Sequence, residues 1–364
     1  MVGIFFYVRK TAVTGIAKAH HIRLGTLSKI KGYILPLTLL IFAGLMLAFP
    51  SHYLDSARKG LAVFSSSVLP AIFPFVFLSG LMSRTSIIDD ISKAFEKPVR
   101  ALFGVSRKGA FVLFSSLICG YPAGAVTIQQ LYTDGKISES EAKSYIPISS
   151  TASPIFVIAT IGGAIFGDMT IGVVILLSHY IGTLLNGVLW RFVLKTRERR
   201  NEPIKNANTP ISEAQKPIAH TRIRICDNNK ENVVGDAMVR ATTSMLAVGG
   251  YFVLFGMVVD TLHLLPFFDT LPIEVRSILS AVIEMSRGAV EARGVSPMWL
   301  SVGLSAFAIT FGGASVGLQN YHYLSQCNCT LRDVILPKIS QGIFAFFMGV
   351  IFSIIFFNIF GIKG

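Results

Sequence analysis

The sequence predicts an all-α membrane protein that passes through the bilayer several times. Its mean hydropathy is +0.61, and only 15% of its residues are charged, against about 25% in a typical soluble protein. The apolar residues also form uncharged runs of at least 19 residues. A membrane-spanning helix needs about 20 mostly apolar residues. We therefore expect about eight hydrophobic segments, at 32–54, 60–83, 109–133, 144–167, 169–190, 241–259, 294–331 and 339–362.

Basic residues indicate which polar stretches face the cytoplasm. The formal net charge is +13, and Lys and Arg gather in residues 1–31, 84–108 and 195–232. Cytoplasmic loops carry an excess of these residues, so we expect all three stretches on the cytoplasmic side of the cell (inner) membrane. The stretch 195–232 has no aromatic residue to stack on bases. The bilayer is therefore the expected partner, with a homo-oligomer as an option and no nucleic acid.

Counting crossings predicts that one hydrophobic segment does not cross the membrane. With the N-terminus inside, three full crossings between 109 and 190 would place the basic stretch 195–232 outside. The best candidates for a segment that enters and leaves on the same side are 109–133 and 144–167. Both contain Gly, Pro and hydroxyl residues, which favour a re-entrant hairpin or an unwound helix.

A helix break is expected near the middle of 109–133. The stretch "CGYPAG" places Gly120, Pro122 and Gly124 where a plain spanning helix would hold Leu, Ile or Val. Non-helical backbone at membrane depth is tolerated only inside protein or along a water-filled cavity. The break therefore predicts a site for a polar solute. A proline kink, or close packing through the GxxxG spacing, is the alternative.

Weak internal matches predict two related, inverted repeats. Residues 65–82 resemble 241–258, residues 114–124 resemble 307–317, and residues 145–150 resemble 335–340, in the same order. Paired repeats with broken helices are typical of secondary transporters. Duplication that serves packing alone is the alternative. The expected division is a basic cytoplasmic segment 1–31, a first transmembrane helix 32–57, a first repeat 58–194, a basic polar cytoplasmic linker 195–235 and a second repeat 236–364.

Polar residues inside the apolar segments are the candidates for a substrate-binding site. The membrane interior makes ionisable groups costly, so Glu284 is a functional candidate, with Arg287 as a pairing partner on the same helix face. An amphipathic interfacial helix is the alternative for that segment. For His179 the alternative is a hydrogen bond between helices. The full set of candidates is Gly120, Pro122, Gly124, Ser150, Thr151, Ser153, Pro154, His179, Glu284, Gly312, Gly313, Ser315 and Gln319.

No enzyme, cofactor or metal site is expected. The sequence contains no G-x-S-x-G, H-E-x-x-H or Walker A motif and no paired acids within one apolar segment. Cys327 and Cys329 have the spacing of a soft-metal pair, but no His or third Cys lies at ligand spacing. Ordinary thiols are therefore the simpler interpretation.

Several motifs resemble a known family. "VLPAIFPFVFLSGL", "LFSSLICGYPAGA", "HYIGTLLNGVLWR" and "ITFGGASVGLQ" are similar, in matching order over roughly residues 33–360, to the YlbJ-type sporulation integral membrane proteins. These belong to the group that carries the nucleoside-recognition (Gate) domain. The resemblance implies duplicated Gate-like units with re-entrant hairpins around a solute site, and a role in forming the spore cortex. The matching positions are Gly120, Pro122, Gly124, Gly312, Gly313, Ser315 and Gln319.

Three functions are compatible with these features. The first is a transporter or permease for a small polar, nucleoside-like solute, working by alternating access. The second is a membrane scaffold or assembly factor in sporulation without transport activity. The third, an intramembrane enzyme, has no motif in its favour.

Overall fold

The computed structural model describes residues 33, 35–82, 87–201 and 233–360. The predicted basic segment 1–31 and most of the linker 195–235 lie outside the described residues. Within them every regular element is helical, which confirms the predicted all-α class. The chain divides into two compact units, Met1–Asp55 and Ser56–Gly364. In the first unit, the helix Leu35–Ala48 precedes α2 (Pro50–Val63), which runs on into the second unit.

Four described helices are long and apolar enough to cross a membrane, and counting each of two bent helix pairs as one span gives six. The prediction of several spans is thus confirmed, although the eight uncharged runs are not eight straight crossings. The four helices are Met169–Thr196, Val233–Leu262, Met298–Cys327 and Leu331–Ile359, and the bent pairs are Leu35–Ala48 with Pro50–Ser66 and Ser92–Phe103 with Arg107–Cys119.

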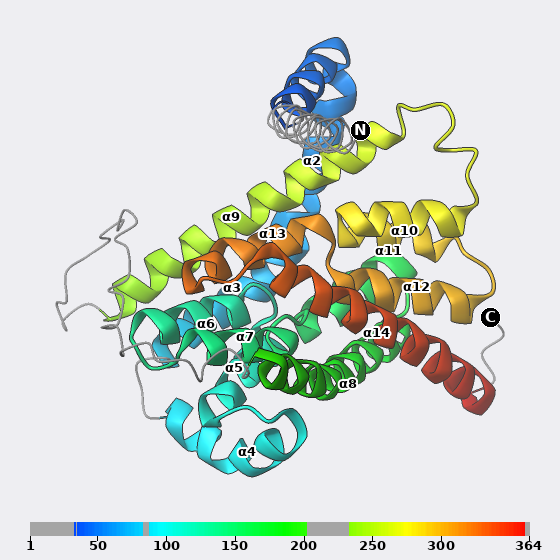
Figure 1. Cartoon of the computed structure of the whole chain (residues 1–364). Coiled ribbons are helices and arrows are strands. Elements are labelled where there is room, and N and C mark those ends of the chain that lie inside the picture. The colour runs from blue at the N-terminus through cyan, green and yellow to red at the C-terminus, as the bar shows by residue number, and fades with distance from the viewer. Residues whose placement is uncertain (1–32, 34, 83–86, 202–232, 361–364) are drawn as a thin grey trace, which may run out of the picture. The chain divides into compact units, whose positions relative to one another are not determined.

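The second unit is built from two successive series of helices (Figure 1). The first series is η1, a π-helix (Phe64–Val68), α3 (Leu69–Met82), α4 (Ile87–Phe103), α5 (Arg107–Cys119), α6 (Ala123–Thr133), α7 (Glu139–Tyr145), η2 (Ile146–Ile148), η3, a π-helix (Phe156–Phe166), and α8 (Met169–Asn201). The second is α9 (Val233–Leu262), α10 (Ile273–Ile283), α11 (Met285–Arg293), α12 (Met298–Phe311), α13 (Gly313–Leu324), η5 (Ser325–Cys327) and α14 (Leu331–Phe360).

Two helix pairs fold back on themselves as hairpins. In the first hairpin, α5–α6, Ser115 Oγ lies 3.1 Å from Thr127 Oγ1, whereas a continuous helix would separate these residues by about 18 Å along its axis. Gly120 makes the turn with φ +78°, a conformation that favours glycine. In the second hairpin, α10–α11, Ser277 Oγ donates to the carbonyl of Gly288 at 3.0 Å. The segment 109–133 thus bends back on itself. It is one of the two segments predicted as candidates for entering and leaving the membrane on the same side.

Two other helical stretches are each interrupted by a short break. The first break, residues 149–153, separates α7 and η2 from η3. The second break, Gly312–Gly313, separates α12 from α13, and both glycines have positive φ, at +78° and +68°. The stretch Met298–Cys327, which includes the second break, still qualifies as a single span.

The hairpins, breaks and long helices recur in the same order in both halves. α6 and α8 begin at Ala123 and Met169, and α11 and α14 begin 162 residues later in each case, at Met285 and Leu331. Contacts between the halves are reciprocal, because α6 packs against α13 while η3 packs against α11. A broken helix, α8 and α9 separate the two hairpins. The recurrence of the same elements in the same order agrees with two related repeats, and their inverted arrangement in the membrane stays a prediction.

The structure aligns the repeats differently from the sequence matches. The match of 114–124 with 307–317 pairs the turn at Gly120 with the break at Gly313. In the fold, the turn of the first hairpin corresponds to Glu284, and the first break corresponds to Gly312–Gly313. The mismatch arises because short Gly-rich strings serve both for hairpin turns and for helix breaks.

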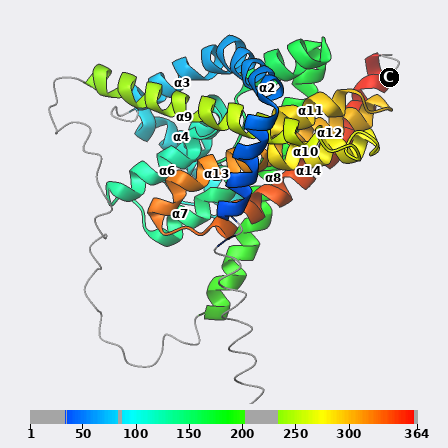
Figure 2. The same cartoon turned by 90° about the horizontal axis from the view of Figure 1, so that it is seen from above.

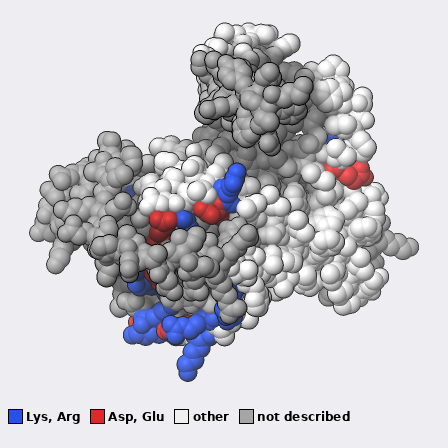
Figure 3. All heavy atoms as spheres, viewed as in Figure 1, with Lys and Arg blue, Asp and Glu red and all other residues white. Residues whose placement is uncertain are grey.

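The surface of this unit separates charged from apolar regions. Figure 3 shows blue side chains gathered at the end where Figure 1 places α4, and α4 exposes Lys93, Lys97 and Arg100. On α14, by contrast, Phe347 and Ile355 are each at least half exposed, as expected of side chains that face lipid. Figure 2 shows the polar C-terminal end of α8 extending away from the neighbouring helices.

Glycine allows each hairpin to lie directly against the break of its own half. A Cβ atom at Gly124 would lie 1.8 Å from the carbonyl oxygen of Ser149, and one at Gly313 would lie 2.7 Å from the carbonyl oxygen of Ile283. No side chain fits at these distances. The predicted close-packing role of the GxxxG spacing and its role as a backbone break therefore both apply, with Gly124 serving the first and Gly120 the second.

We predict that Gly124→Ala destabilises the protein strongly, while Gly250→Ala does not. The added methyl at position 124 must displace backbone, and such overpacking costs about 1–3 kcal/mol or more. Gly250 is a matched control in a helix, where an added Cβ atom would meet nothing within 4 Å, and alanine there gains up to about 1 kcal/mol of helix propensity. Thermal unfolding in detergent measures both. Equal midpoints for the two variants would contradict the close contact.

Candidate functional site

Side chains from other helices hold the backbone amides of the first break. The amide of Thr151 donates to Ser116 Oγ at 3.0 Å, and that hydroxyl is also 2.8 Å from Thr151 Oγ1. The amide of Ala152 donates to His179 Nε2 at 2.8 Å. The Nδ1 atom of His179 lies 2.7 Å from Thr310 Oγ1, just before the second break. His179 is thus a hydrogen-bonding bridge between the two breaks, the alternative considered for it from the sequence.

The carbonyl groups of the first break are held by donors from α8 and α14. Ser150 O accepts a hydrogen bond from Gln341 Nε2 at 3.0 Å and another from Lys338 Nζ at 3.3 Å. Pro147 O, just before the break, accepts from Asn186 Nδ2 at 3.0 Å. Unsatisfied backbone groups in an apolar interior cost several kcal/mol each, so these contacts are what make the unwound segment tolerable.

The tip of the first hairpin reaches into the second half. Tyr121 Oη donates to the carbonyl of Ile309 at 2.8 Å and lies 2.8 Å from the sulfur of Met285. The Lys338 Nζ atom lies over the aromatic ring of Tyr121, 5.3 Å from the ring centroid. Tyr121 therefore touches the second hairpin, the residues before the second break and α14 at once.

A small cavity lies where the hairpin tips and the two breaks meet. Its volume is about 20 Å³, room for roughly one water molecule. We call it the central cavity; its polar wall is Tyr121, Ser153, Glu284, Ser315 and Gln319, and its apolar wall is Val68, Ile72, Phe156, Val248, Phe252, Met285 and Val316. Polar groups thus come from both halves, while η1, α3 and α9 supply most of the apolar side.

Glu284 caps the N-terminus of α11 from the wall of the cavity. Its carboxylate accepts the amides of Ser286 at 3.1 Å and Arg287 at 2.9 Å, and also the Ser286 hydroxyl. Arg287 Nη2 bonds instead to Asp260 Oδ2 at 2.9 Å, so the side-chain pair considered from the sequence does not form. Glu284 is only 1% exposed, so these protein donors take the place of water around its carboxyl group.

Most of the predicted site residues converge, although only some reach the cavity. Ser153, Glu284, Ser315 and Gln319 line it. Gly120 and Pro122 form the hairpin turn, Gly312 and Gly313 the second break, and Gly124 the close contact with Ser149. The others lie in or beside the first break but off the cavity wall: Ser150, Thr151, Pro154 and His179. Solute binding by any of these residues stays a prediction.

Sequence reasoning missed Tyr121 and Lys338. Tyr121 lies inside the "CGYPAG" string, where the glycines and the proline give the stronger signal. Lys338 lies immediately before the uncharged run 339–362 in the sequence, whereas in the structure it is 3% exposed and within α14. A single lysine in "ILPKISQGIF" was the available signal, because a buried charge in an apolar segment is costly.

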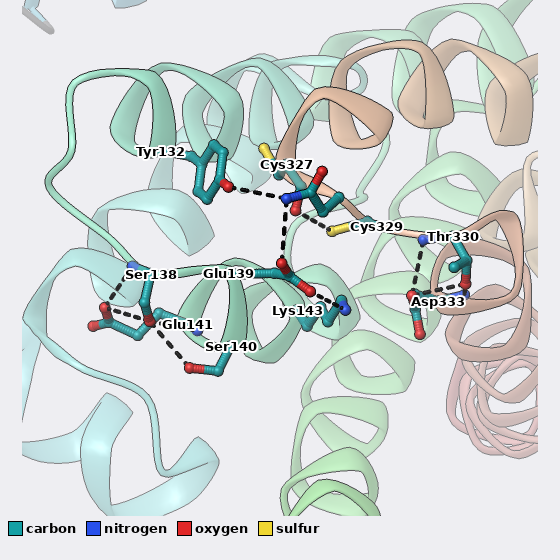
Figure 4. A network of polar contacts seen from close by, with 11 residues as sticks. Tyr132, Ser138, Glu139, Ser140, Glu141, Lys143, Cys327, Cys329, Thr330 and Asp333 are labelled. Carbon is teal, nitrogen blue, oxygen red and sulfur yellow. Dashed lines mark hydrogen bonds and ion pairs between the residues drawn. The ribbon is translucent and has the colours of Figure 1, made fainter. Parts of the chain in front are cut away.

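A second polar network joins the halves away from the cavity (Figure 4). Asn328 Nδ2 donates to Tyr132 Oη and to Glu139 Oε2, both at 3.3 Å. Lys143 Nζ bonds to Glu139 Oε1 at 2.6 Å. The Cys329 thiol, which bonds to the Cys327 carbonyl at 3.6 Å, lies beside them. In the described part of the chain no group of three His, Cys, Asp or Glu residues is placed to hold a metal ion.

We predict that Glu139 stabilises the protein in a pH-dependent way. The hydrogen bond from Lys143 lowers the pKa of Glu139 below its ordinary value of 4.5. A carboxyl with a lowered folded-state pKa adds stability that is complete above its unfolded pKa and is lost as pH falls through the folded one. The stability difference between wild type and Glu139→Gln should therefore be full near about pH 6 and vanish towards about pH 3.

Thermal unfolding across this pH range measures the difference. A Lys143→Met background is the control, because removing the partner removes the main cause of the shift. A difference that persists unchanged down to about pH 3, or that survives in the Lys143→Met background, would contradict the assignment.

The fold defines the class of protein before any comparison. It is a multi-pass α-helical membrane protein in which two hairpins and two broken helices meet at a small cavity with one polar wall. Residues 65–169 match the Gate family model, described as nucleoside recognition. This match runs from η1 to the start of α8 and so contains the first hairpin and the first break.

Similarity to a sporulation protein extends over nearly the whole chain. The chain is 24% identical over 335 residues to the sporulation integral membrane protein YlbJ of Bacillus subtilis (strain 168), covering 88% of this chain and 82% of the relative. No solved structure matches. The resemblance predicted from the quoted motifs is confirmed by both comparisons.

Proposed function

We propose that the protein binds a small polar solute in the central cavity and carries it across the cell membrane by alternating access. The observation that carries this proposal is that polar side chains from both hairpin tips and from beside both breaks meet at one otherwise apolar cavity. A fold that only needed stable packing would gain nothing from placing Ser, Gln and Glu there, because buried polar groups are costly in the membrane. No catalytic step is assigned to these residues.

Unused hydrogen-bonding capacity on the cavity wall supports solute binding. Gln319 is 6% exposed, and its side chain makes no hydrogen bond to the described residues. Leaving a buried amide unpaired costs about 1–3 kcal/mol, so a water or solute is the natural partner. The Ser153 and Ser315 hydroxyls make only long local contacts, both at 3.4 Å. These groups remain able to contact a ligand.

The size of the cavity indicates a closed state. A nucleoside needs far more room than about 20 Å³, and pockets for such ligands occupy roughly 300–1,000 Å³. The apolar wall formed by Val68 and Ile72 on one side and Val248 and Phe252 on the other is the natural place for opening. We propose that η1, α3 and α9 move relative to the hairpin tips.

The family match and the sporulation relative support our proposal for the solute and for the cellular role. The Gate description favours a nucleoside-like solute, and hydroxyl, amide and carboxylate groups beside Tyr121 and Phe156 suit a hydroxylated ring compound. Similarity to the Bacillus subtilis sporulation protein supports a role in sporulation, which we place in spore cortex formation. The proposed topology keeps the N-terminus and the linker 195–235 in the cytoplasm.

A scaffold function is the second candidate. The cavity is too small for a solute in this conformation, and the first break is held by hydrogen bonds from within the protein. A structural role in a sporulation complex requires no opening. In that case the polar linker 195–235, not the cavity, would carry the essential contacts.

We predict that Gln319→Ala lowers solute uptake about tenfold without lowering the amount of protein in the membrane. Losing one hydrogen bond to a solute, at about 1.4 kcal/mol, corresponds to that factor. Because Gln319 bonds to no described residue, its removal should leave the fold intact. The measurement is radiotracer uptake into proteoliposomes, screened over nucleosides and cell-wall precursors.

Gln130→Ala is the matched control, because Gln130 lies on α6 outside the cavity wall. If the protein is a transporter, Gln319→Ala should lower solute uptake and Gln130→Ala should not. No uptake of any solute by wild type, together with sporulation that withstands Gln319→Ala but fails with linker changes, would reject transport in favour of the scaffold.

A further inference from the structure

An ammonium group is buried beside the first break with no acidic partner. Lys338 lies in α14, directly after Pro337, and is 3% exposed. Among the described residues, no carboxylate lies within 4.0 Å of its Nζ atom, since none of the ion pairs there includes it. An isolated charge in an apolar interior is strongly unfavourable. The charged form of Lys338 therefore depends on its neighbours to compensate for the lost hydration.

The neighbours of Lys338 are the groups that bind a monovalent cation. The carbonyl of Ser150, freed by the first break, lies 3.3 Å from Nζ. The ring of Tyr121 presents its face at 5.3 Å, within the range of a cation–π interaction. Unwound carbonyls of broken helices coordinate the coupling cation in secondary transporters. In this chain the ammonium lies where such a cation would bind.

Among the described residues, the second break has no equivalent cation. The offset of 162 residues that relates α8 to α14 places Leu176 opposite Lys338 and His179 opposite Gln341. Beside the second break, the carbonyl of Ile309 accepts a hydrogen bond from the Tyr121 hydroxyl. No ammonium group in the described part of the chain donates to it, in contrast to the carbonyl of Ser150. The positive charge is therefore specific to the first break, where it holds the hairpin tip and the unwound segment together.

We propose that Lys338 supplies a tethered cation that fills a monovalent-cation site formed by Ser150 O and the Tyr121 ring. Removing the side chain leaves an unfilled site that takes up a free ion of suitable size. The proposal concerns ion binding and stability, and it holds whether or not the protein transports a solute.

The test is thermal unfolding of the purified full chain in detergent, with chloride salts of choline, Na⁺, K⁺ and methylammonium at equal ionic strength. Wild type should show the same midpoint in all four. Lys338→Ala should unfold about 5 °C lower in choline chloride and recover part of that loss in methylammonium, Na⁺ or K⁺. Lys97→Ala, at an exposed position on α4, is the matched control and should show no salt-specific recovery.

Lys338→Met separates charge from packing, because it keeps much of the length of the side chain and removes the ammonium. It should be as unstable as Lys338→Ala but gain nothing from the salts, since its side chain occupies the site. A Met variant as stable as wild type, or an Ala variant with no salt-specific recovery, would overturn the proposal.

A second measurement covers variants that fail to yield purified protein. The amount of fluorescently tagged protein in the membrane is compared for Lys338→Arg and Lys338→Met. The proposal requires accumulation of the Arg variant, which keeps a cation, well above that of the Met variant. Equal amounts of the two would count against a role for the charge.

Discussion

The fold depends on satisfying backbone groups where the helix is interrupted inside an apolar environment. At the first break, residues 149–153, the amides of Thr151 and Ala152 and the carbonyl of Ser150 bond to side chains instead of helical partners, and lipid could not satisfy them. Side chains of Ser116, His179, Gln341 and Lys338 take that place, from three different helices. Hydrogen bonds to this one short segment therefore fix the positions of all three helices. The packing of the two halves against each other follows from these positions.

Gly124 and Tyr121 pack the region around the first break closely, yet they leave the central cavity unfilled. Gly124 brings the first hairpin into direct backbone contact with Ser149, and Tyr121 extends from the hairpin tip to the residues before the second break. What is left between these contacts is the central cavity, whose wall still carries Gln319 without a partner among the described residues. Different residues thus hold the fold and remain available to a ligand, although the two sets lie close to each other.

The sequence predicted the class, the interruption at Gly120 and four of the residues that line the cavity, because each has a local signal. Long uncharged runs, a Gly-Pro cluster at mid-membrane depth and isolated polar residues can be recognised without knowing the fold. The pairing of the repeats could not be recognised, since a hairpin turn at Gly120 and a helix break at Gly313 use similar short strings. The contact of Lys338 with Ser150 was also out of reach, because 188 residues separate them along the chain.

The position of Lys338 has a consequence for how the chain assembles during synthesis. The unwound segment near Ser150 enters the bilayer early, yet two of the donors that satisfy its carbonyl, Lys338 and Gln341, lie on the last long helix of the described chain. Until α14 has been inserted, that carbonyl has to be hydrated or shielded by other means. The first half is thus completed only once α14 has been inserted, so a chain released before α14 would retain a polar defect that membrane quality control can recognise.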